Sequence, residues 1–301
     1  MTLPASVRPD VVARSASMPP DRTRAFFRAA RIIHPFPTLV NVAAVAGLAF
    51  VAARGAPDAP VLLRMLAVML CAQSAIGVAN DYFDRDLDAA AKPWKPIAAG
   101  VVSPAVAAAL ALGFVAVATA LAATLGVGGF ALAMLGMTCG LAYDARLKRT
   151  IFSALPYMIA VPTLPLWVWA TLDAWQPVLW WLLPLGALIG LALHLANTLP
   201  DIASDADHGV AGLPHRLGAR TARLAAWASF GGALTLSAVL APFLHYDLRF
   251  LAPAILVGGA GLAASIGIFA ARRDEFALQL GFGVLSMASA LLAVGWLAAV
   301  T

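Results

Sequence analysis

The stretch Asn80-Asp81-Tyr82-Phe83-Asp84-Arg85-Asp86-Leu87-Asp88 places four aspartates within eight residues, at the end of a long apolar run. On a helix, Asn80, Asp84 and Asp88 recur at every fourth position, so their side chains project from one face, with Asp81 on its flank. Like charges at this spacing destabilise a helix, and buried carboxylates need a partner or a metal. Oxygen ligands suit Mg²⁺, which proteins usually hold through one or two carboxylates together with waters and substrate phosphates. The stretch therefore predicts a Mg²⁺ site for a phosphate or diphosphate; the alternative is a solvated acidic helix end.

The composition is that of a membrane protein. Hydrophobic residues make up 62% of the chain and charged residues 12%, against about a quarter charged in soluble domains. Backbone polar groups in lipid must be satisfied internally, so the apolar stretches are helices. We expect an all-α polytopic membrane protein with nine transmembrane helices in a bundle and cytoplasmic helical loops that carry Asp-rich motifs. The expected spans are 36–53, 61–80, 103–123, 126–143, 152–171, 178–200, 222–242, 250–270 and 277–299.

The distribution of charge predicts the orientation. The net charge of +5 would suggest nucleic acid in a soluble protein, but all of the 20 Lys and Arg except Arg54, Arg64 and Arg249 fall on one side of the nine spans. By the positive-inside rule that side is cytoplasmic. We therefore expect no nucleic-acid partner and an integral multi-pass protein of a bacterial cytoplasmic membrane, with the N-terminus and the motif loops in the cytoplasm. Cys71 and Cys139 lie inside predicted spans and are expected to be core residues.

The N-terminal residues differ in character from the rest. Residues 1–22 are rich in Pro, Ser and Arg without an apolar core, which predicts a disordered cytoplasmic tail and not a signal peptide. From Asp21 to Ile33, arginines alternate with Phe and Ile, the pattern of a basic amphipathic helix on an anionic membrane surface. Residues 23–301 are expected to form a single transmembrane domain.

A second acidic motif ends the sixth predicted span. Asn197, Asp201 and Asp205 repeat the spacing of the first motif, again at the cytoplasmic end of an even-numbered span. This indicates a weak internal duplication, with halves near 23–143 and 151–242. Repeats in membrane proteins often place a substrate site at their interface. We therefore expect the two acidic helix ends to face each other across a cavity.

Several other polar residues are candidates for the same cavity. Asn41 and His194 lie in predicted spans, where each can contact substrate or simply hydrogen-bond within the bundle. Lys92 and Lys95 follow the first motif and Arg216 follows the second, where phosphate binding and membrane orientation are competing roles. The sequence does not indicate an oligomeric state.

The first motif resembles a signature of the UbiA superfamily of intramembrane prenyltransferases, through the pattern Asn80-Asp81-x-x-Asp84-x-x-x-Asp88. Asp201-x-x-x-Asp205, preceded by Asn197, resembles the second signature of that family. Tyr143 and Lys148 resemble the family's tyrosine and lysine after span four; from the residues alone they would be an interface aromatic and an orientation charge. The resemblance covers nearly the whole chain and implies a nine-helix bundle with both motifs at the cytoplasmic side.

This resemblance implies specific roles for the motif residues. Two Mg²⁺ ions would bridge a prenyl diphosphate, and Lys148, with Arg146, would neutralise the charge of the departing diphosphate. Tyr143 would face the allylic carbocation, and Asp81 or Asp201 would activate the acceptor. The implied metal ligands are Asn80, Asp84, Asp88, Asn197, Asp201 and Asp205.

The resemblance leaves the acceptor open. Lysine replaces the arginine that often precedes proline in the family's loop, here Lys92-Pro93-Trp94-Lys95-Pro96, and Arg31 is the one candidate for an acceptor carboxylate near span one. We expect transfer of a polyprenyl group to a small lipophilic acceptor, foremost an aromatic quinone precursor, with a tetrapyrrole, phosphosugar or glycerol phosphate as alternatives. A transporter for a divalent cation or protons, and a non-catalytic lipid-binding protein, are the hypotheses from other classes.

Overall fold

The computed structural model describes residues 27–202 and 211–300, and within these ranges it contains helices and no strand. The predicted tail, residues 1–22, lies outside the described residues. Short elements connect the long helices: α4 (Arg85–Ala91) and the 3₁₀ turns η1 (Arg31–Ile33), η2 (Ala123–Leu125), η3 (Leu147–Arg149), η4 (Pro177–Trp181) and η5 (Leu199–Asp201). The long helices are α2 (Pro35–Ala52), α3 (Ala59–Phe83), α5 (Pro104–Ala122), α6 (Gly126–Ala145), α7 (Leu155–Thr171), α8 (Leu182–Thr198), α10 (Leu213–Leu244), α11 (Leu248–Ala271) and α12 (Glu275–Val300).

The described residues include seven helical segments that are long and apolar enough to cross a membrane. The sequence predicted nine spans, and two features account for the difference. Pro104–Ala145 counts as one segment of 42 residues although it contains both α5 and α6, and α7 is shorter than the other spans. The prediction of an all-helical membrane protein is confirmed at this level.

The helix boundaries follow from local capping. Asp58 accepts a hydrogen bond from Val61 N at the start of α3, and Ser103 accepts one from Val106 N at the start of α5. In both helices a proline lies in the first turn. The backbone N–H groups of this turn have no intrahelical acceptor, so the N–H that proline lacks is not needed there. These caps fix the residues at which α3 and α5 begin.

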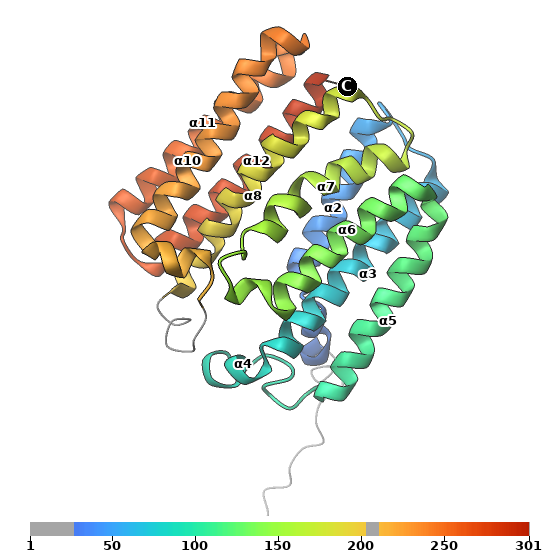
Figure 1. Ribbon diagram of the computed structural model, residues 1–301, viewed down its shortest axis with the longest axis vertical. Helices are drawn as coiled ribbons and strands as arrows, with labels where there is room; N and C mark the ends of the chain where they lie inside the picture. Colours follow the sequence, from blue (N-terminus) through green and yellow to red (C-terminus); the bar gives the residue numbers. More distant parts are fainter. Residues whose placement is uncertain (1–26, 203–210, 301) are drawn as a thin grey trace, which may run out of the picture.

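Six helices provide most of the lining of a central chamber. Contacts link α2 to α3, α3 to α6, α6 to α7, α7 to α8 and α8 to α12, and α12 touches α2. Outside this group, α5 packs on α3, and α10 and α11 pack behind α8 and α12 (Figure 1). Helices α7 and α8 approach closely because Gly190 has no side chain: a Cβ there would lie 2.7 Å from the Tyr157 carbonyl carbon.

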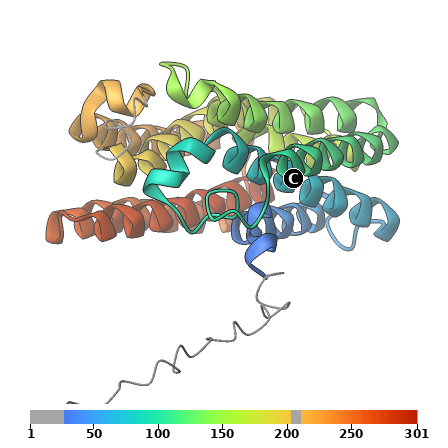
Figure 2. The same cartoon turned by 90° about the horizontal axis from the view of Figure 1, so that it is seen from below.

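Both acidic segments lie at the same end of the bundle. Helix α3 stops at Phe83, and α4 lies across this end, as Figures 1 and 2 show; α8 also ends here and leads into η5. The first motif does not form one continuous helix as its spacing suggested. Asp84 (φ −95°, ψ 3°) breaks the helix and separates α3 from α4.

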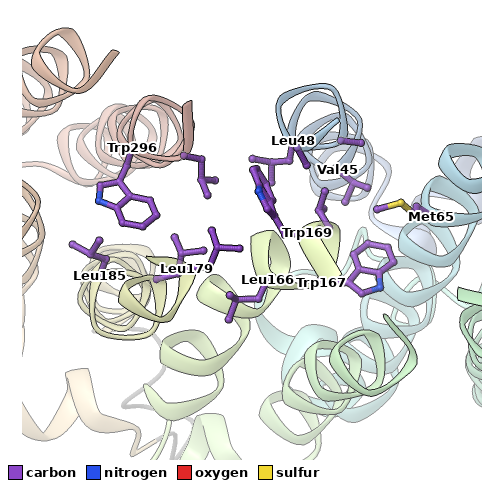
Figure 3. Close-up of a cluster of buried hydrophobic side chains, with 14 of the residues drawn as sticks. Val45, Leu48, Met65, Leu166, Trp167, Trp169, Leu179, Leu185 and Trp296 are labelled. Carbon is purple, nitrogen blue, oxygen red and sulfur yellow. The ribbon is translucent and has the colours of Figure 1, made fainter. Parts of the chain in front are cut away.

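The opposite half of the bundle is packed with apolar side chains. Figure 3 shows Val45 and Leu48 of α2 beside Trp169 of α7, with Trp296 to one side and Trp167 to the other. Val45 and Trp169 are completely buried. The interior of the bundle is thus polar near the acidic motifs and apolar in the opposite half.

Candidate active site

The first acidic motif forms a buried ion-pair network with Lys95. The loop after α4 folds back, so the Lys95 ammonium lies 2.8 Å from Asp88 Oδ2 and 3.0 Å from Asp81 Oδ1. The same ammonium donates to Asn80 Oδ1 at 3.3 Å. Asp81 is 1% exposed and Asp88 4%. These carboxylates would be too costly to bury without such a partner.

A second lysine joins α6 to the same cluster. Lys148 forms an ion pair with Asp84 and lies 3.9 Å from Asp144 Oδ1. The Asn80 amide links the two helices by donating to Asp144 Oδ1 at 2.9 Å. Arg149 reaches Asp84 Oδ1 from the rim at 3.4 Å. The structure therefore brings Lys148, which the family resemblance suggested, to Asn80 and Asp84 of the first motif.

His34 completes the network from the start of α2. Its Nε2 lies 2.9 Å from Asp81 Oδ1. The residue adopts the left-handed conformation (φ 49°, ψ 65°), and it can pack against α3 because Gly77 presents no side chain: a Cβ at Gly77 would lie 3.2 Å from the His34 ring. The turn before α2 thus delivers an imidazole to Asp81.

With His34 neutral, the charges in this cluster are negative on balance. Asp81, Asp84, Asp88 and Asp144 are all at most 9% exposed, and they face the partly buried Lys95 and Lys148 and the exposed Arg149. Burial raises the pKa of the Asp88 carboxyl above its ordinary value, although Lys95 opposes this. Burial alone would lower the pKa of Lys95, but its contacts with Asp88 and Asp81 outweigh that cost and raise it. The cluster favours an additional cation.

The donor atoms fit a hard divalent cation. Asp81 Oδ2 and Asp144 Oδ2 are buried without a hydrogen-bond partner, and carboxylate and amide oxygens are the ligands that Mg²⁺ prefers. Within residues 27–202 and 211–300, no three His, Cys, Asp or Glu side chains enclose a metal site by themselves.

The second motif faces the same chamber. Asn197 at the end of α8 and Asp201 in η5 both line it, together with Asn80, Asp84 and Asp88. Asn197 also hydrogen-bonds the phenol of Tyr157. Asp205, the last predicted metal ligand, lies outside the described residues. The described parts of the two motifs therefore meet at one cavity, as the sequence predicted.

An aromatic wall lies directly below the acidic residues. The Tyr143 ring meets Tyr157 edge-on at 5.4 Å between centroids and His194 at 5.8 Å. His194 is buried on α8 and its Nε2 lies 2.9 Å from Ser153 Oγ. Ser153 Oγ also accepts from Leu213 N, which holds the start of α10 against this wall. Tyr143 and His194 both line the chamber.

The chamber is large and mostly apolar. Its volume is about 1200 Å³, beyond the usual range for drug-sized ligands. It extends from Asp84 at the polar end to Trp167 and Trp296 at the apolar end. Such a shape suits a long hydrocarbon attached to an anionic head.

The remaining predicted residues divide into two groups. Asn41, Lys92 and Lys95 line the chamber, and the Asn41 amide donates to Pro37 O on its own helix.

Arg146 and Arg216 do not line the chamber. Both are exposed, and Arg216 donates instead to Ala211 O. Arg31, the one arginine available for an acceptor carboxylate, is also exposed. No arginine of the described ranges lines the chamber.

Three residues of the network were not predicted: His34, Asp144 and Arg149. For Asp144 a signal existed, because it precedes Lys148 by four residues and such pairs share a helix face. His34 and Arg149 carry no comparable signal, since their contacts with Asp81 and Asp84 join segments far apart in the chain.

Comparison with known proteins agrees with this geometry. The family model described as "UbiA prenyltransferase family" matches residues 40–280. Among curated relatives, the digeranylgeranylglyceryl phosphate synthase of Methanoregula boonei is 30% identical over 194 residues, 64% of this chain and 68% of the relative. The synthase of the same name from Hyperthermus butylicus is 32% identical over 251 residues, 70% of this chain and 77% of the relative.

Solved structures share the fold. A UbiA homolog from Archaeoglobus fulgidus bound to DMAPP and Mg²⁺ superposes with a TM-score of 0.72 at 18% identity, covering 90% of this chain and 98% of that one. The same homolog bound to GPP and Mg²⁺ gives a TM-score of 0.70 at 17% identity, covering 91% and 100%. The family match over most of the sequence, joined to this fold and these motifs, establishes that the chain is a member of the UbiA prenyltransferase family.

Proposed function

We propose that this protein transfers a polyprenyl group from its diphosphate to a hydroxyl group of a glycerol phosphate lipid, in a Mg²⁺-dependent reaction. The observation that carries the proposal is the position of the acidic cluster at the mouth of a long apolar chamber. The cluster matches a metal-bound diphosphate and the chamber matches the attached hydrocarbon. A cation transporter is not favoured, because the buried carboxylates gather at one end of the bundle.

The proposed reaction breaks one bond and forms another at the same carbon. The bond between prenyl C1 and the diphosphate oxygen breaks, and its electron pair leaves with the diphosphate. The acceptor oxygen forms a new ether bond to C1 and gives up its proton. Asp81 and Asp201 are the candidates to receive that proton, and Asp81 is already hydrogen-bonded to His34.

The metal ligands are proposed from both motifs. Bound Mg²⁺ supplies electrostatic stabilisation of the diphosphate as it leaves. Two ions are expected, held by Asn80, Asp84, Asp88, Asn197, Asp201 and Asp205. Lys148 and Lys95 form ion pairs with motif carboxylates in the structure, so each is placed to contact a phosphate oxygen next to the metal ligands.

The aromatic wall is proposed to protect the allylic cation. Tyr143 and Tyr157 lie beneath the acidic cluster and line the chamber. The face of an aromatic ring attracts positive charge, and the apolar surroundings exclude water that would otherwise capture the cation.

A glycerol phosphate lipid is favoured over an aromatic acid as the acceptor. The curated relatives described above are named digeranylgeranylglyceryl phosphate synthases, whereas the sequence had favoured a quinone precursor. The arginine that the family resemblance implies for an aromatic carboxylate, Arg31, is exposed and does not line the chamber. Lys92 lines the chamber without an acidic partner among the described residues, and we assign it to the acceptor phosphate.

The orientation follows the charge pattern of the sequence. We propose that nine segments cross the membrane, with α5 and α6 as separate spans and α7 as a short one. The acidic end then lies in the cytoplasm, where prenyl diphosphates are available.

An acceptor screen tests the proposal. The purified protein, reconstituted in lipid nanodiscs, would receive geranylgeranyl diphosphate, Mg²⁺ and one of three acceptors: glycerol phosphate, prenylated glyceryl phosphate or 4-hydroxybenzoate. We expect Mg²⁺-dependent pyrophosphate release and an ether product with a glyceryl phosphate. Turnover with the aromatic acid alone would contradict the assigned acceptor, and release that persists in chelator would contradict the assigned metal.

A further inference from the structure

Three arginines gather outside the chamber, where α10 and the end of α11 meet. They are Arg220 and Arg223 of α10 and Arg273, which follows α11. Arg220 and Arg273 are exposed, and both lie close enough to Arg223 for their charges to act on it. We call these three residues the basic corner.

Aromatic rings hold the Arg223 side chain in place. Its guanidinium carbon lies 3.6 Å from the centre of the Phe269 ring and 5.6 Å from that of Trp227. Trp227 Nε1 in turn donates to Ser265 Oγ at 3.2 Å, which ties α10 to α11. A cation over an aromatic face is attracted to it, so this guanidinium has a fixed position. Its Nε is buried without a hydrogen-bond partner.

A small groove lies beside Arg223 and separates the basic corner from the chamber. Trp227, Ser265 and Phe269 line it together with Arg223. Ala196 and Leu199, on either side of Asn197 in the chain, line it as well, whereas Asn197 itself lines the chamber. The basic corner therefore lies behind the second motif and not within the reaction site.

The acidic side chains next to the basic corner in sequence have other partners. Asp274 pairs with Arg272 at 2.8 Å, and Glu275 accepts from the Gln279 amide at 2.8 Å. Within residues 27–202 and 211–300, no carboxylate forms an ion pair with the three arginines of the corner. A group of like charges without a counter-charge attracts an anion.

The length of α10 places this corner near the membrane surface. The helix is interrupted at Gly218 (φ 75°, ψ 153°), and the part from 219 to 244 is about 39 Å long at 1.5 Å per residue. A bilayer core is only about 30 Å thick, so the first turns after Gly218 lie at the level of the lipid headgroups. Exposed apolar side chains, Leu224 on α10 and Ile266 on α11, continue from there towards the hydrocarbon.

We propose that the basic corner binds the phosphate of an anionic phospholipid. Guanidinium groups match phosphate oxygens in charge and in planar geometry, and basic pockets between membrane helices are suited to anionic headgroups. The phosphate supplies the counter-charge that the described carboxylates do not, and the lipid chains lie against Leu224 and Ile266. The site goes beyond the proposed transferase reaction and does not depend on it, since it binds lipid without donor or acceptor.

A titration of the full-length protein in detergent tests the site. Native mass spectrometry would count the phosphatidylglycerol molecules bound at each concentration. Arg223→Met keeps the apolar stem but removes the charge, and should weaken binding of the first lipid about tenfold; Arg223→Lys should retain part of it. Arg249→Met is the matched control, because Arg249 lies at the opposite end of α11 and already pairs with Asp247. Equal affinities of Arg223→Met and the unmodified protein, or equal losses in Arg249→Met, would overturn the proposal.

An exposed member of the corner gives a second test that does not depend on Arg223 packing. Arg273→Met should weaken binding of phosphatidylglycerol about threefold, and unchanged binding in this variant would also refute the site.

Two further ligands distinguish a lipid from other sources of phosphate. Phosphatidylcholine, whose phosphate charge is balanced within its own headgroup, should bind at least about tenfold more weakly than phosphatidylglycerol. Inorganic phosphate should not displace phosphatidylglycerol, because it lacks the chains that contact the apolar side chains. Equal binding of phosphatidylcholine would show that the charge is not recognised, and displacement by inorganic phosphate would show a site for free anions; either result overturns the assignment.

Discussion

The polar and apolar ends of the chamber are stabilised by different interactions. At the polar end, Asp81, Asp84 and Asp88 are buried against Lys95 and Lys148. At the apolar end, Val45, Leu48, Trp169 and their neighbours pack without charged partners. A buried ion pair is easily disrupted by loss of one member, whereas apolar packing tolerates changes of shape. The rate of the reaction should therefore depend on individual side chains at the polar end. The fit of the substrate should depend on the volume of the side chains at the apolar end.

The largest effect is expected at Asp84, at the break between α3 and α4. Asp84→Ala removes a predicted metal ligand and the ion-pair partner of Lys148, and should lower the rate of pyrophosphate release by about 10³-fold or more. The control is Asp86→Ala, because Asp86 lies two residues away with an exposed side chain. Steady-state kinetics of both variants would check this, and equal loss of activity would refute the distinction between buried and exposed acids.

A substitution at the apolar end should lower the stability of the protein more than it affects the reaction. Trp169→Ala removes a fully buried ring from the contact between α2 and α7 and should cost about 3 kcal/mol of unfolding free energy. Activity measured below the unfolding transition should keep its dependence on Mg²⁺. Thermal unfolding in detergent, followed by intrinsic fluorescence, gives the first quantity. A stable but Mg²⁺-independent or inactive variant would show that the two ends are not separable.

Lys148 should matter more than a neighbouring basic residue. Lys148→Met removes the cation beside Asp84 and should reduce kcat about 100-fold, as expected for loss of one group that stabilises a departing anion. Arg146→Met changes the same charge at an exposed position two residues away and should have little effect. Comparable losses of kcat in the two variants would assign the effect to overall charge.

The smallest effect at the polar end is expected at Tyr143. Tyr143→Leu removes the aromatic face and should slow turnover about tenfold, whereas Tyr143→Phe retains the ring and should remain close to the unmodified protein. Single-turnover rates would separate the two. A large loss in the phenylalanine variant would mean that the hydroxyl, and not the ring, contributes.

The sequence predicted much of the polar end because its signal is local. Asn80, Asp84 and Asp88 share one spacing, Asn197 and Asp201 repeat it, and the structure places all five at one chamber. The resemblance implied that Arg146 lies beside the diphosphate together with Lys148. The structure does not place it there, because α6 ends at Ala145 and Arg146 adopts φ −153° and ψ −42°. The following 3₁₀ turn carries Lys148 and Arg149 to Asp84 and leaves Arg146 exposed.

The sequence could not reveal features that depend on tertiary packing. His34 meets Asp81 because a left-handed turn lies against Gly77, and nothing in the spacing of these residues indicates it. The packing of α2 against α7 likewise depends on apolar residues that resemble those of every other span. The sequence predicted the third and fourth spans as two separate helices. In the structure only a short 3₁₀ turn, η2, lies between α5 and α6.

The central claim is that both acidic motifs bind the same metal-bound diphosphate. The most direct test is anomalous scattering from crystals grown with Mn²⁺ in place of Mg²⁺ and with geranylgeranyl thiodiphosphate. We expect manganese peaks between Asn80, Asp84 and Asp88 on one side and Asn197 and Asp201 on the other, with the diphosphate bridging them. Manganese bound at one motif alone, or a diphosphate outside the chamber, would contradict the account.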